Sequence, residues 1–283
     1  MNKIASDVMK TFFLTVIGRK FITSLCAVAC LTQVQAQVVN LNHNNTFAQI
    51  SLNTQNGMFN WTVDGQPQLF QQWFWYRVGP GGPEQSIDTI GAPVFSSPTP
   101  RDLTATYFTP GFNITVDYHL TGGLPGSGVA DMAETITINN TGLNPLPMHF
   151  YQYSDFDLGA SPGGDTVELF PIAGKYFLAR QSQGPVAFSE TVTTPGADHG
   201  EASNVPLTLA KLNNAGPDML NDFNGPLFGN VTWAFQWDFL INPGDSKIIS
   251  KDKRLEINVI PEPATGLLLA MGFGALVLRR RST

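Results

Sequence analysis

Short runs of alternating apolar and polar residues, separated by glycine and proline, fill most of the chain between residues 37 and 258. Such runs place side chains on the two faces of a strand in turn, and the 27 Gly and 20 Pro of the chain supply turns between them. Asn56-Gly57 predicts a tight hairpin turn, since both turn positions need positive φ. The clearest predicted strands are 68–78, 112–120, 133–140, 148–158, 175–181, 186–192, 231–241 and 246–258. The pattern predicts an all-β fold, an antiparallel β-sandwich of jelly-roll or supersandwich type, with residues 196–230 unassigned.

The first 36 residues have the order of a secretory signal peptide, which is expected to be helical. Basic residues precede the apolar stretch 21–31, and small residues follow it. The basic residues are Lys10, Arg19 and Lys20, and the small ones are Val34 and Ala36. We expect signal peptidase to cut after Ala36 and to leave Gln37 as the new N terminus. Lipid attachment at Cys30 is the alternative, and Met9 could be the true initiator.

Export leaves a mature domain without cysteine and with a strong excess of acidic residues. Both cysteines, Cys26 and Cys30, lie in the leader, so no disulfide is expected. The two terminal segments contain seven of the 16 basic residues and two of the 22 acidic ones. The domain between them therefore has 9 basic and 20 acidic residues, and its net charge is −11. Because a phosphate backbone needs a basic surface, nucleic acid is excluded as a partner.

The C terminus carries an uncharged apolar run at 264–278, followed by Arg279, Arg280 and Arg281. As a helix the run would span about 22 Å. This is shorter than the hydrocarbon core, about 30 Å, so a transmembrane helix would need the arginines to reach the interface. The positive-inside rule then leaves the arginines in the cytoplasm and the domain outside. A buried core helix is the alternative, which the lack of alternating polar residues disfavours.

The extreme C terminus has three parts in fixed order: Pro261, Glu262 and Pro263, the apolar run, and the three arginines. This arrangement resembles the PEP-CTERM sorting signal of Gram-negative bacteria. The resemblance implies transient membrane anchoring and cleavage near the Pro-Glu-Pro segment by an exosortase, a membrane-embedded cysteine transpeptidase-like enzyme. It also implies a place at the cell surface or outside the cell, among proteins of exopolysaccharide and biofilm systems. The expected segments are a signal peptide at 1–36, a β-sandwich domain at 37–258 and a sorting signal at 259–283.

The predicted strand at 148–158 places aromatic and acidic side chains on one face. Period two puts His149, Tyr151, Tyr153, Asp155 and Asp157 together on that face. The tyrosines could stack on a sugar while the aspartates accept its hydroxyl hydrogen bonds, or Asp155 and Asp157 could bind Ca²⁺. The alternative is the exposed side of an ordinary strand that runs into an acidic turn.

Tryptophans form two further stripes. Trp73, Trp75 and Arg77 share one face, and Trp233, Phe235, Trp237 and Phe239 share another, with Gln236 and Asp238 opposite. We expect such stripes to be core, because aromatic rings bury large areas in a sandwich without disulfides, and a carbohydrate platform at Trp73 and Trp75 is the alternative.

Signatures of catalysis and of transition-metal binding are absent from the sequence. His43, His119, His149 and His199 are scattered without ligand spacing, so no zinc site is expected. The glycine-rich stretches do not lead from a strand into a helix, and no nucleophile elbow occurs. Glu134 with Asp155 is one of several acid pairs that could serve a glycosidase. We predict no catalytic residue and no cofactor, with Ca²⁺ the one candidate ion.

Residues 112–120, 134–140 and 145–158 resemble the strand, Asn turn, Pro and His-bearing strand order of galactose-mutarotase-like supersandwiches. In that resemblance His149 corresponds to the family's histidine, and the second catalytic histidine and the acidic base have no match. We expect a non-catalytic, structural or glycan-binding protein of the exopolysaccharide matrix. The alternatives are a carbohydrate-active enzyme, mutarotase-like or glycosidase, and a Ca²⁺-dependent adhesive module.

Overall fold

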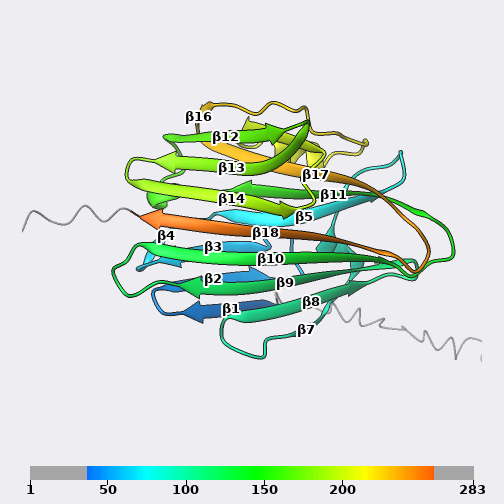
Figure 1. The fold of residues 1–283 in the computed structure, drawn as a ribbon, viewed down its shortest axis with the longest axis horizontal. Helices are drawn as coiled ribbons and strands as arrows, with labels where there is room; N and C mark the ends of the chain where they lie inside the picture. The colour runs from blue at the N-terminus through cyan, green and yellow to red at the C-terminus, as the bar shows by residue number, and fades with distance from the viewer. Residues whose placement is uncertain (1–36, 258–283) are drawn as a thin grey trace, which may run out of the picture. The chain divides into compact units, whose positions relative to one another are not determined.

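The computed structural model describes residues 37–257, which form two antiparallel sheets packed face to face (Figure 1). The predicted all-β sandwich is confirmed. Sheet A has the strand order β1-β2-β3-β5-β11-β17-β15, with β4 beside β3 and β6 beside β5. Sheet B, in front in Figure 1, has the order β16-β12-β13-β14-β18-β10-β9-β8-β7.

The strands of sheet A are β1 (Val38–His43), β2 (Thr46–Ser51), β3 (Met58–Val63), β4 (Gln66–Pro67), β5 (Gln71–Val78), β6 (Gln85–Ser86), β11 (Leu146–Asp155), β15 (His199–Asn204) and β17 (Val231–Ile241). The strands of sheet B are β7 (Val94–Ser96), β8 (Asp102–Phe108), β9 (Phe112–Gly122), β10 (Val129–Asn140), β12 (Asp165–Ile172), β13 (Lys175–Gln183), β14 (Val186–Thr194), β16 (Leu227–Gly229) and β18 (Ser246–Ile257). Helical pieces are short: η1 (Ile87–Ile90), η2 (Leu158–Ala160) and α2 (Leu207–Leu212).

The hairpin predicted at Asn56-Gly57 forms, but its turn is longer than predicted. β2 and β3 pair, and residues 52–57 connect them. Gly57 alone of the pair has positive φ, at 55°. A Cβ on Gly57 would lie 2.2 Å from the Trp73 ring, so close packing as well as conformation requires glycine there.

The interior of the sandwich is rich in aromatic rings. All five tryptophans are at most 1% exposed: Trp61, Trp73, Trp75, Trp233 and Trp237. Phe150 of sheet A stacks on Phe74 of the neighbouring strand, with ring centroids 5.6 Å apart. Burial confirms that both stripes are packed away from solvent, with Trp233 and Trp237 between the sheets and Trp75 covered on the outer face of sheet A, as expected for a domain without disulfides.

Four charged side chains lie fully buried between the sheets. Glu134 of β10, Glu190 of β14, and Lys251 and Lys253 of β18 all have side chains with no exposed surface. Each lysine pairs with both glutamates, and Lys251 Nζ lies 2.5 Å from Glu134 Oε2 and 3.4 Å from Glu190 Oε1. Burial alone would raise the pKa of Glu134, but the two lysines hold this pKa below its ordinary value. The group is therefore a neutral tetrad.

Sheet A completes this tetrad through one side chain. Gln152 of β11 donates from Nε2 to Glu190 Oε2 at 2.9 Å and accepts a hydrogen bond from Lys251. The ammonium of Lys251 also lies 5.0 Å from the centroid of the Phe74 ring. These contacts tie β11 and β5 of one sheet to the charged strands of the other.

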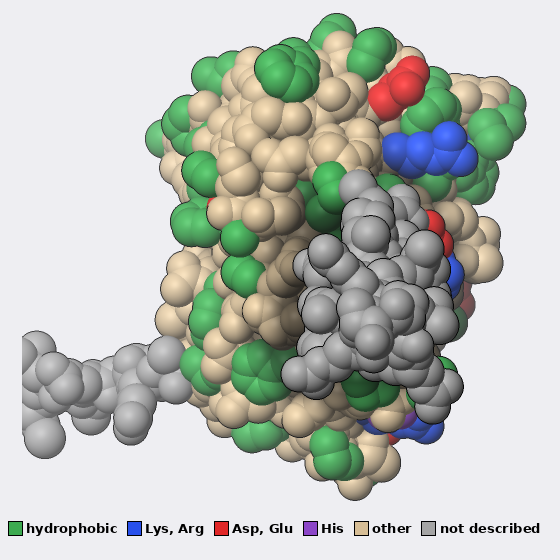
Figure 2. Space-filling model, turned by 90° about the vertical axis from the view of Figure 1, so that its left-hand side faces the viewer, with side chains coloured by type: hydrophobic (Ala, Val, Ile, Leu, Met, Phe, Trp, Pro, Cys, Tyr) green, Lys and Arg blue, Asp and Glu red, His purple; other side chains and the backbone are tan. Residues whose placement is uncertain are grey.

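The described residues visible in Figure 2 carry dispersed hydrophobic side chains and few charged ones. Within residues 37–257 no helix is long and apolar enough to span a bilayer. The predicted signal peptide and the predicted transmembrane helix at 264–278 lie outside the described residues.

Glu134→Gln is expected to lower the free energy of unfolding by about 3–5 kcal/mol, because it leaves two buried ammonium groups against one carboxylate. Urea denaturation followed by tryptophan fluorescence measures this loss. Asp131→Asn is the matched control, since Asp131 lies on the same strand and its exposed pair with Arg254 is worth less than about 1 kcal/mol. Equal stability of the two variants would contradict the role assigned to the tetrad.

Candidate functional site

The outer face of sheet A, turned away from sheet B, collects the polar and aromatic side chains of four adjacent strands. Because Gln152 of β11 reaches into the interior, the odd-numbered residues of this strand point outward, as period two predicts. The pairing register then aligns rows across β5, β11, β17 and β15. One row is Arg77, His149 and Asp238, and the next is Trp75, Tyr151, Gln236 and His199.

At one end of this face, two histidines and two aspartates form a connected group, here called the histidine site: His149, His199, Asp222 and Asp238. His149 Nδ1 lies 2.6 Å from Asp238 Oδ1, and His199 Nε2 lies 3.5 Å from Asp238 Oδ2. Asp222 Oδ2 lies 3.0 Å from the other ring nitrogen of His199. Exposure of these side chains ranges from 21% for His149 to 49% for Asp222, so solvent and a small ligand can reach the group.

Hydrogen bonding assigns a role to each ring nitrogen of His149. A carboxylate only accepts hydrogen bonds, so Nδ1 donates to Asp238, and in the neutral imidazole Nε2 carries the lone pair. Nε2 has no hydrogen-bond partner among residues 37–257. Gln236 Nε2 donates to Asp238 Oδ1 at 2.9 Å and fixes the carboxylate from the neighbouring row. The arrangement can therefore accept a proton or a hydrogen bond at His149 Nε2.

A buried arginine lies next to His149 across the strand pair. Arg77 Nε donates to Glu84 Oε1 at 2.8 Å, and Arg77 Nη2 donates to the Tyr151 hydroxyl at 3.2 Å. Burial would lower the pKa of Arg77, but Glu84 and Tyr151 raise it above its ordinary value. The Asp218 backbone joins the cluster, since its N–H donates to Glu84 and its carbonyl accepts from Tyr151 at 3.0 Å.

The segment 205–226 covers much of the outer face. Leu220 N–H donates to Gln236 Oε1 at 3.1 Å, and Asn221 N–H donates to Glu201 Oε2 at 2.9 Å. At its helical start, the Thr208 hydroxyl donates to Glu201 Oε1 at 2.6 Å, so Glu201 lies buried beneath this segment. Asp222 of this segment belongs to the histidine site, whose side chains stay partly exposed.

Segment 205–226 contacts two of the predicted sugar-stacking residues, since Trp75 Nε1 donates to Asn213 Oδ1 and the Tyr151 hydroxyl donates to the Asp218 carbonyl. Trp73, Trp75, Tyr151 and Tyr153 occupy the strands as predicted but are at most 1% exposed, so the expectation that the tyrosine face meets water is wrong. Their rings pack on protein, as Trp75 does against Tyr153 with centroids 6.1 Å apart. Of the five residues predicted to bind glycan, His149 alone reaches the surface.

The predicted Ca²⁺ ligands belong to a buried acidic group. Asp155 and Asp165 are 4% and 1% exposed, and each leaves Oδ1 without a hydrogen-bond partner. Burial, and then the charge of Asp157, raises the pKa of Asp155 to about 7. Burial raises the pKa of Asp157 and brings that of Asp165 to about 6. No group of three or more His, Cys, Asp or Glu within residues 37–257 is placed to hold a metal ion.

The acid pair considered for a glycosidase does not converge. Glu134 lies between the sheets with its lysine partners, whereas Asp155 lies on β11 with its carboxylate against the Tyr153 hydroxyl of the outer face. The two carboxyl groups therefore lie on opposite sides of sheet A, and this candidate is withdrawn.

Sequence analysis missed His199, Asp222 and Asp238 as partners of His149. Asp238 was assigned to the polar face of its strand, but its neighbour across β11 depends on the pairing register. His199 and Asp222 lie in the unassigned stretch 196–230, where two strands, β15 and β16, and the short helix α2 are seen. The predicted processing residues Ala36, Pro261, Glu262, Pro263, Arg279, Arg280 and Arg281 lie outside the described residues.

No protein-family model matches the sequence, and no curated protein matches it significantly. Two solved structures share its architecture. A protein predicted to be an aldose 1-epimerase, from Escherichia coli K12, aligns with a TM-score of 0.53 and 12% identity over 79% of this chain and all of that one. A bacterial glucoamylase in complex with acarbose aligns with a TM-score of 0.53 and 9% identity over 83% of this chain. The chain spans about a third of the glucoamylase, 34% of its length.

At such identities the likeness shows the fold alone. The described residues share the fold of these two structures, and the supersandwich resemblance of residues 112–120, 134–140 and 145–158 agrees with this at the level of fold.

Asp155→Asn is expected to stabilise the protein at alkaline pH. The pKa of Asp155 is about 7 in the folded protein and about 3.9 in an unfolded chain. Between about pH 4 and pH 7 the carboxyl is protonated in the folded protein and ionised in the unfolded chain. The free energy of unfolding therefore falls as the pH rises through this range, and the full contribution of the proton is present only below about pH 4. At pH 8 the variant should gain about 1–3 kcal/mol, and at pH 4 it should match the wild type.

Thermal unfolding from pH 4 to pH 8 measures the effect, with Asp245→Asn in the exposed turn after β17 as the matched control. The same pH dependence in the wild type and in Asp155→Asn would contradict the assignment. A higher melting temperature of the wild type with CaCl₂ at pH 8, absent in the variant, would show that the acidic group holds a cation.

Proposed function

We propose that the domain binds carbohydrate at the histidine site, as part of an exported protein that works at the cell surface or in an exopolysaccharide matrix. The observation that carries this proposal is the open, connected group of His149, Asp238, His199 and Asp222 on the outer face of sheet A. Further support comes from the fold, which is shared with a predicted aldose epimerase and with a glucoamylase seen with acarbose.

The histidine site suits the hydroxyl groups of a sugar. Carboxylates accept hydrogen bonds from vicinal hydroxyls, and an imidazole nitrogen with a free lone pair accepts another. Gln236 and the strand pairing hold Asp238 in place, so little side-chain freedom is lost on binding. With the tryptophans and tyrosines buried, recognition in this conformation uses polar groups rather than stacking.

A second candidate function is interconversion of sugar anomers. It is favoured by the two imidazoles that flank a single carboxylate, because mutarotation needs one group to take a proton from the anomeric hydroxyl and another to give one to the ring oxygen. His149 Nε2 is the candidate base. This role would make the protein an enzyme, whereas the first needs no catalysis.

We further propose that residues 1–36 direct export and that residues 259–283 act as a sorting signal cut by an exosortase. The basic, apolar and small-residue order of the leader, together with the Pro-Glu-Pro, apolar and arginine order of the tail, supports this proposal. Both signals orient the domain to the outside of the membrane.

His149→Ala is expected to weaken sugar binding by the purified protein at least tenfold, because it removes one acceptor and leaves Asp238 without its donor. A glycan array followed by titration calorimetry with the best neutral oligosaccharide measures this. His119→Ala is the matched control, since His119 forms a similar pair with Asp102 on the outer face of sheet B, with Nδ1 2.5 Å from Oδ1. No binding, or equal loss in both variants, would contradict the proposal. Faster mutarotation of α-D-galactose by polarimetry, lost in His149→Ala, would establish the second candidate.

Replacing Arg279, Arg280 and Arg281 together by Ser is expected to leave the precursor uncut in the native host, since the stop at the cytoplasmic side of the predicted helix is lost. Immunoblots of membrane and extracellular fractions report the precursor and the product. Arg101→Ser, in the domain, serves as the control. Normal processing of the triple variant would show that the arginines are not part of the signal.

A further inference from the structure

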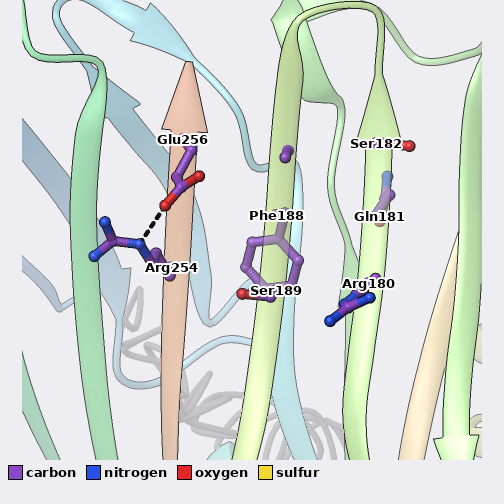
Figure 3. A pocket seen from close by; sticks show the side chains of 8 residues that line it. Arg180, Gln181, Ser182, Phe188, Ser189, Arg254 and Glu256 are labelled. Carbon is purple, nitrogen blue, oxygen red and sulfur yellow. Dashed lines mark hydrogen bonds and ion pairs between the residues drawn. The ribbon is translucent and has the colours of Figure 1, made fainter. Parts of the chain in front are cut away.

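The outer face of sheet B carries a depression that runs along β14. It has a volume of about 290 Å³, and Figure 3 shows several of the side chains around it. The register explains its shape: Ser189 of β14 lies between Arg180 of β13 and Arg254 of β18. One row further, Ala187 lies between Ser182 and Glu256. Small residues on the central strand and longer ones on its neighbours therefore form a groove, here called the β14 trough.

One wall of the trough carries an unpaired positive charge. Arg180 makes no ion pair with any residue in 37–257, and its guanidinium carbon lies 5.1 Å from the centroid of the Phe170 ring. Glu168 is the register partner of Arg180 on β12 but does not form a salt bridge with it. An arginine held over an aromatic ring, with its donors free, is suited to bind a planar carboxylate through two hydrogen bonds.

The other wall carries a fixed pair of opposite charges. Arg254 donates from Nε to Glu256 Oε1 at 2.5 Å and from Nη1 to Asp131 Oδ1 at 3.1 Å, and the first of these bonds is drawn in Figure 3. Nη2 of Arg254 has no hydrogen-bond partner within residues 37–257. The Ser182 and Ser189 hydroxyls make no hydrogen bond with the described part of the chain. The trough therefore offers donors and acceptors for hydroxyl groups beside a single anion-binding arginine.

We propose that the β14 trough binds an acidic saccharide, a sugar chain whose units carry a carboxylate. Arg180 binds the carboxylate, and Ser189, Glu256 and the free nitrogen of Arg254 bind the ring hydroxyls. The mature domain has a net charge of −11 by sequence, which repels polyanions at long range. Selection therefore depends on this local pairing and not on overall charge. The site is distinct from the histidine site, since it lies on the other sheet.

The test uses trigalacturonic acid as the probe, with galactotriose and sodium acetate as comparison ligands, in titration calorimetry with the purified full-length protein at 50 mM salt. We expect trigalacturonic acid to bind at least tenfold more tightly than either comparison ligand. Arg180→Gln should weaken this binding at least tenfold, which corresponds to the loss of one charge-assisted contact. Ser189→Tyr, which fills the trough without changing the charge, should weaken it as well.

Arg101→Gln is the matched control, because it removes the same charge from the turn before β8 and should leave binding unchanged. His149→Ala should also leave it unchanged, which separates this site from the histidine site. The proposal is overturned if trigalacturonic acid does not bind, if galactotriose or acetate binds equally well, or if Arg101→Gln or His149→Ala causes the same loss as Arg180→Gln.

Discussion

The neutral tetrad between the sheets is the constraint on which the rest of the domain depends. Charged groups taken out of water are tolerated only when every one is paired, so the registers of β10, β18 and β14 are coupled. Gln152 extends the coupling to sheet A. Because side chains alternate, a shift of β11 by one residue would remove Gln152 from Glu190 and Lys251 and would turn His149 into the interior. The same pairing thus neutralises the core and directs the histidine site outward.

The two outer faces of the sandwich have different surfaces. On sheet A, the segment 205–226 covers the centre of the face, so the aromatic rows contribute to stability and the polar end is left open. On sheet B, small residues on β14 lie between longer ones on β13 and β18 and create a groove. The aromatic stripes of this protein are therefore buried, and its exposed polar groups lie at the end of the sheet A face and along β14.

Two polar sites on opposite sheets would give the domain two attachment points separated by its core. A protein that holds one sugar chain on each face can link chains in a matrix, and its hold on the matrix exceeds that of either site alone. A structural role in an exopolysaccharide layer is compatible with this geometry and does not require catalysis. In that proposal, the contacts that select the ligand would come from local arginines and not from the acidic net charge.

Local sequence patterns determined the class of fold and many of its strands. The alternating residues at 112–120 and 231–241 form strands, as predicted, and the turn at Gly244 joins β17 to β18. Both could be predicted because alternation and turn chemistry are local properties of the sequence. The same alternation in Asp102–Phe108 and Asp165–Ile172 went unassigned, although it was present in the sequence. Tertiary structure alone decided which strands are neighbours and that Asp238 contacts both His149 and His199. It also decided that Glu134 pairs with Lys251, 117 residues away, and that segment 205–226 buries Tyr151. Long-range pairing is set by the burial of all faces at once, and no single segment contains that information.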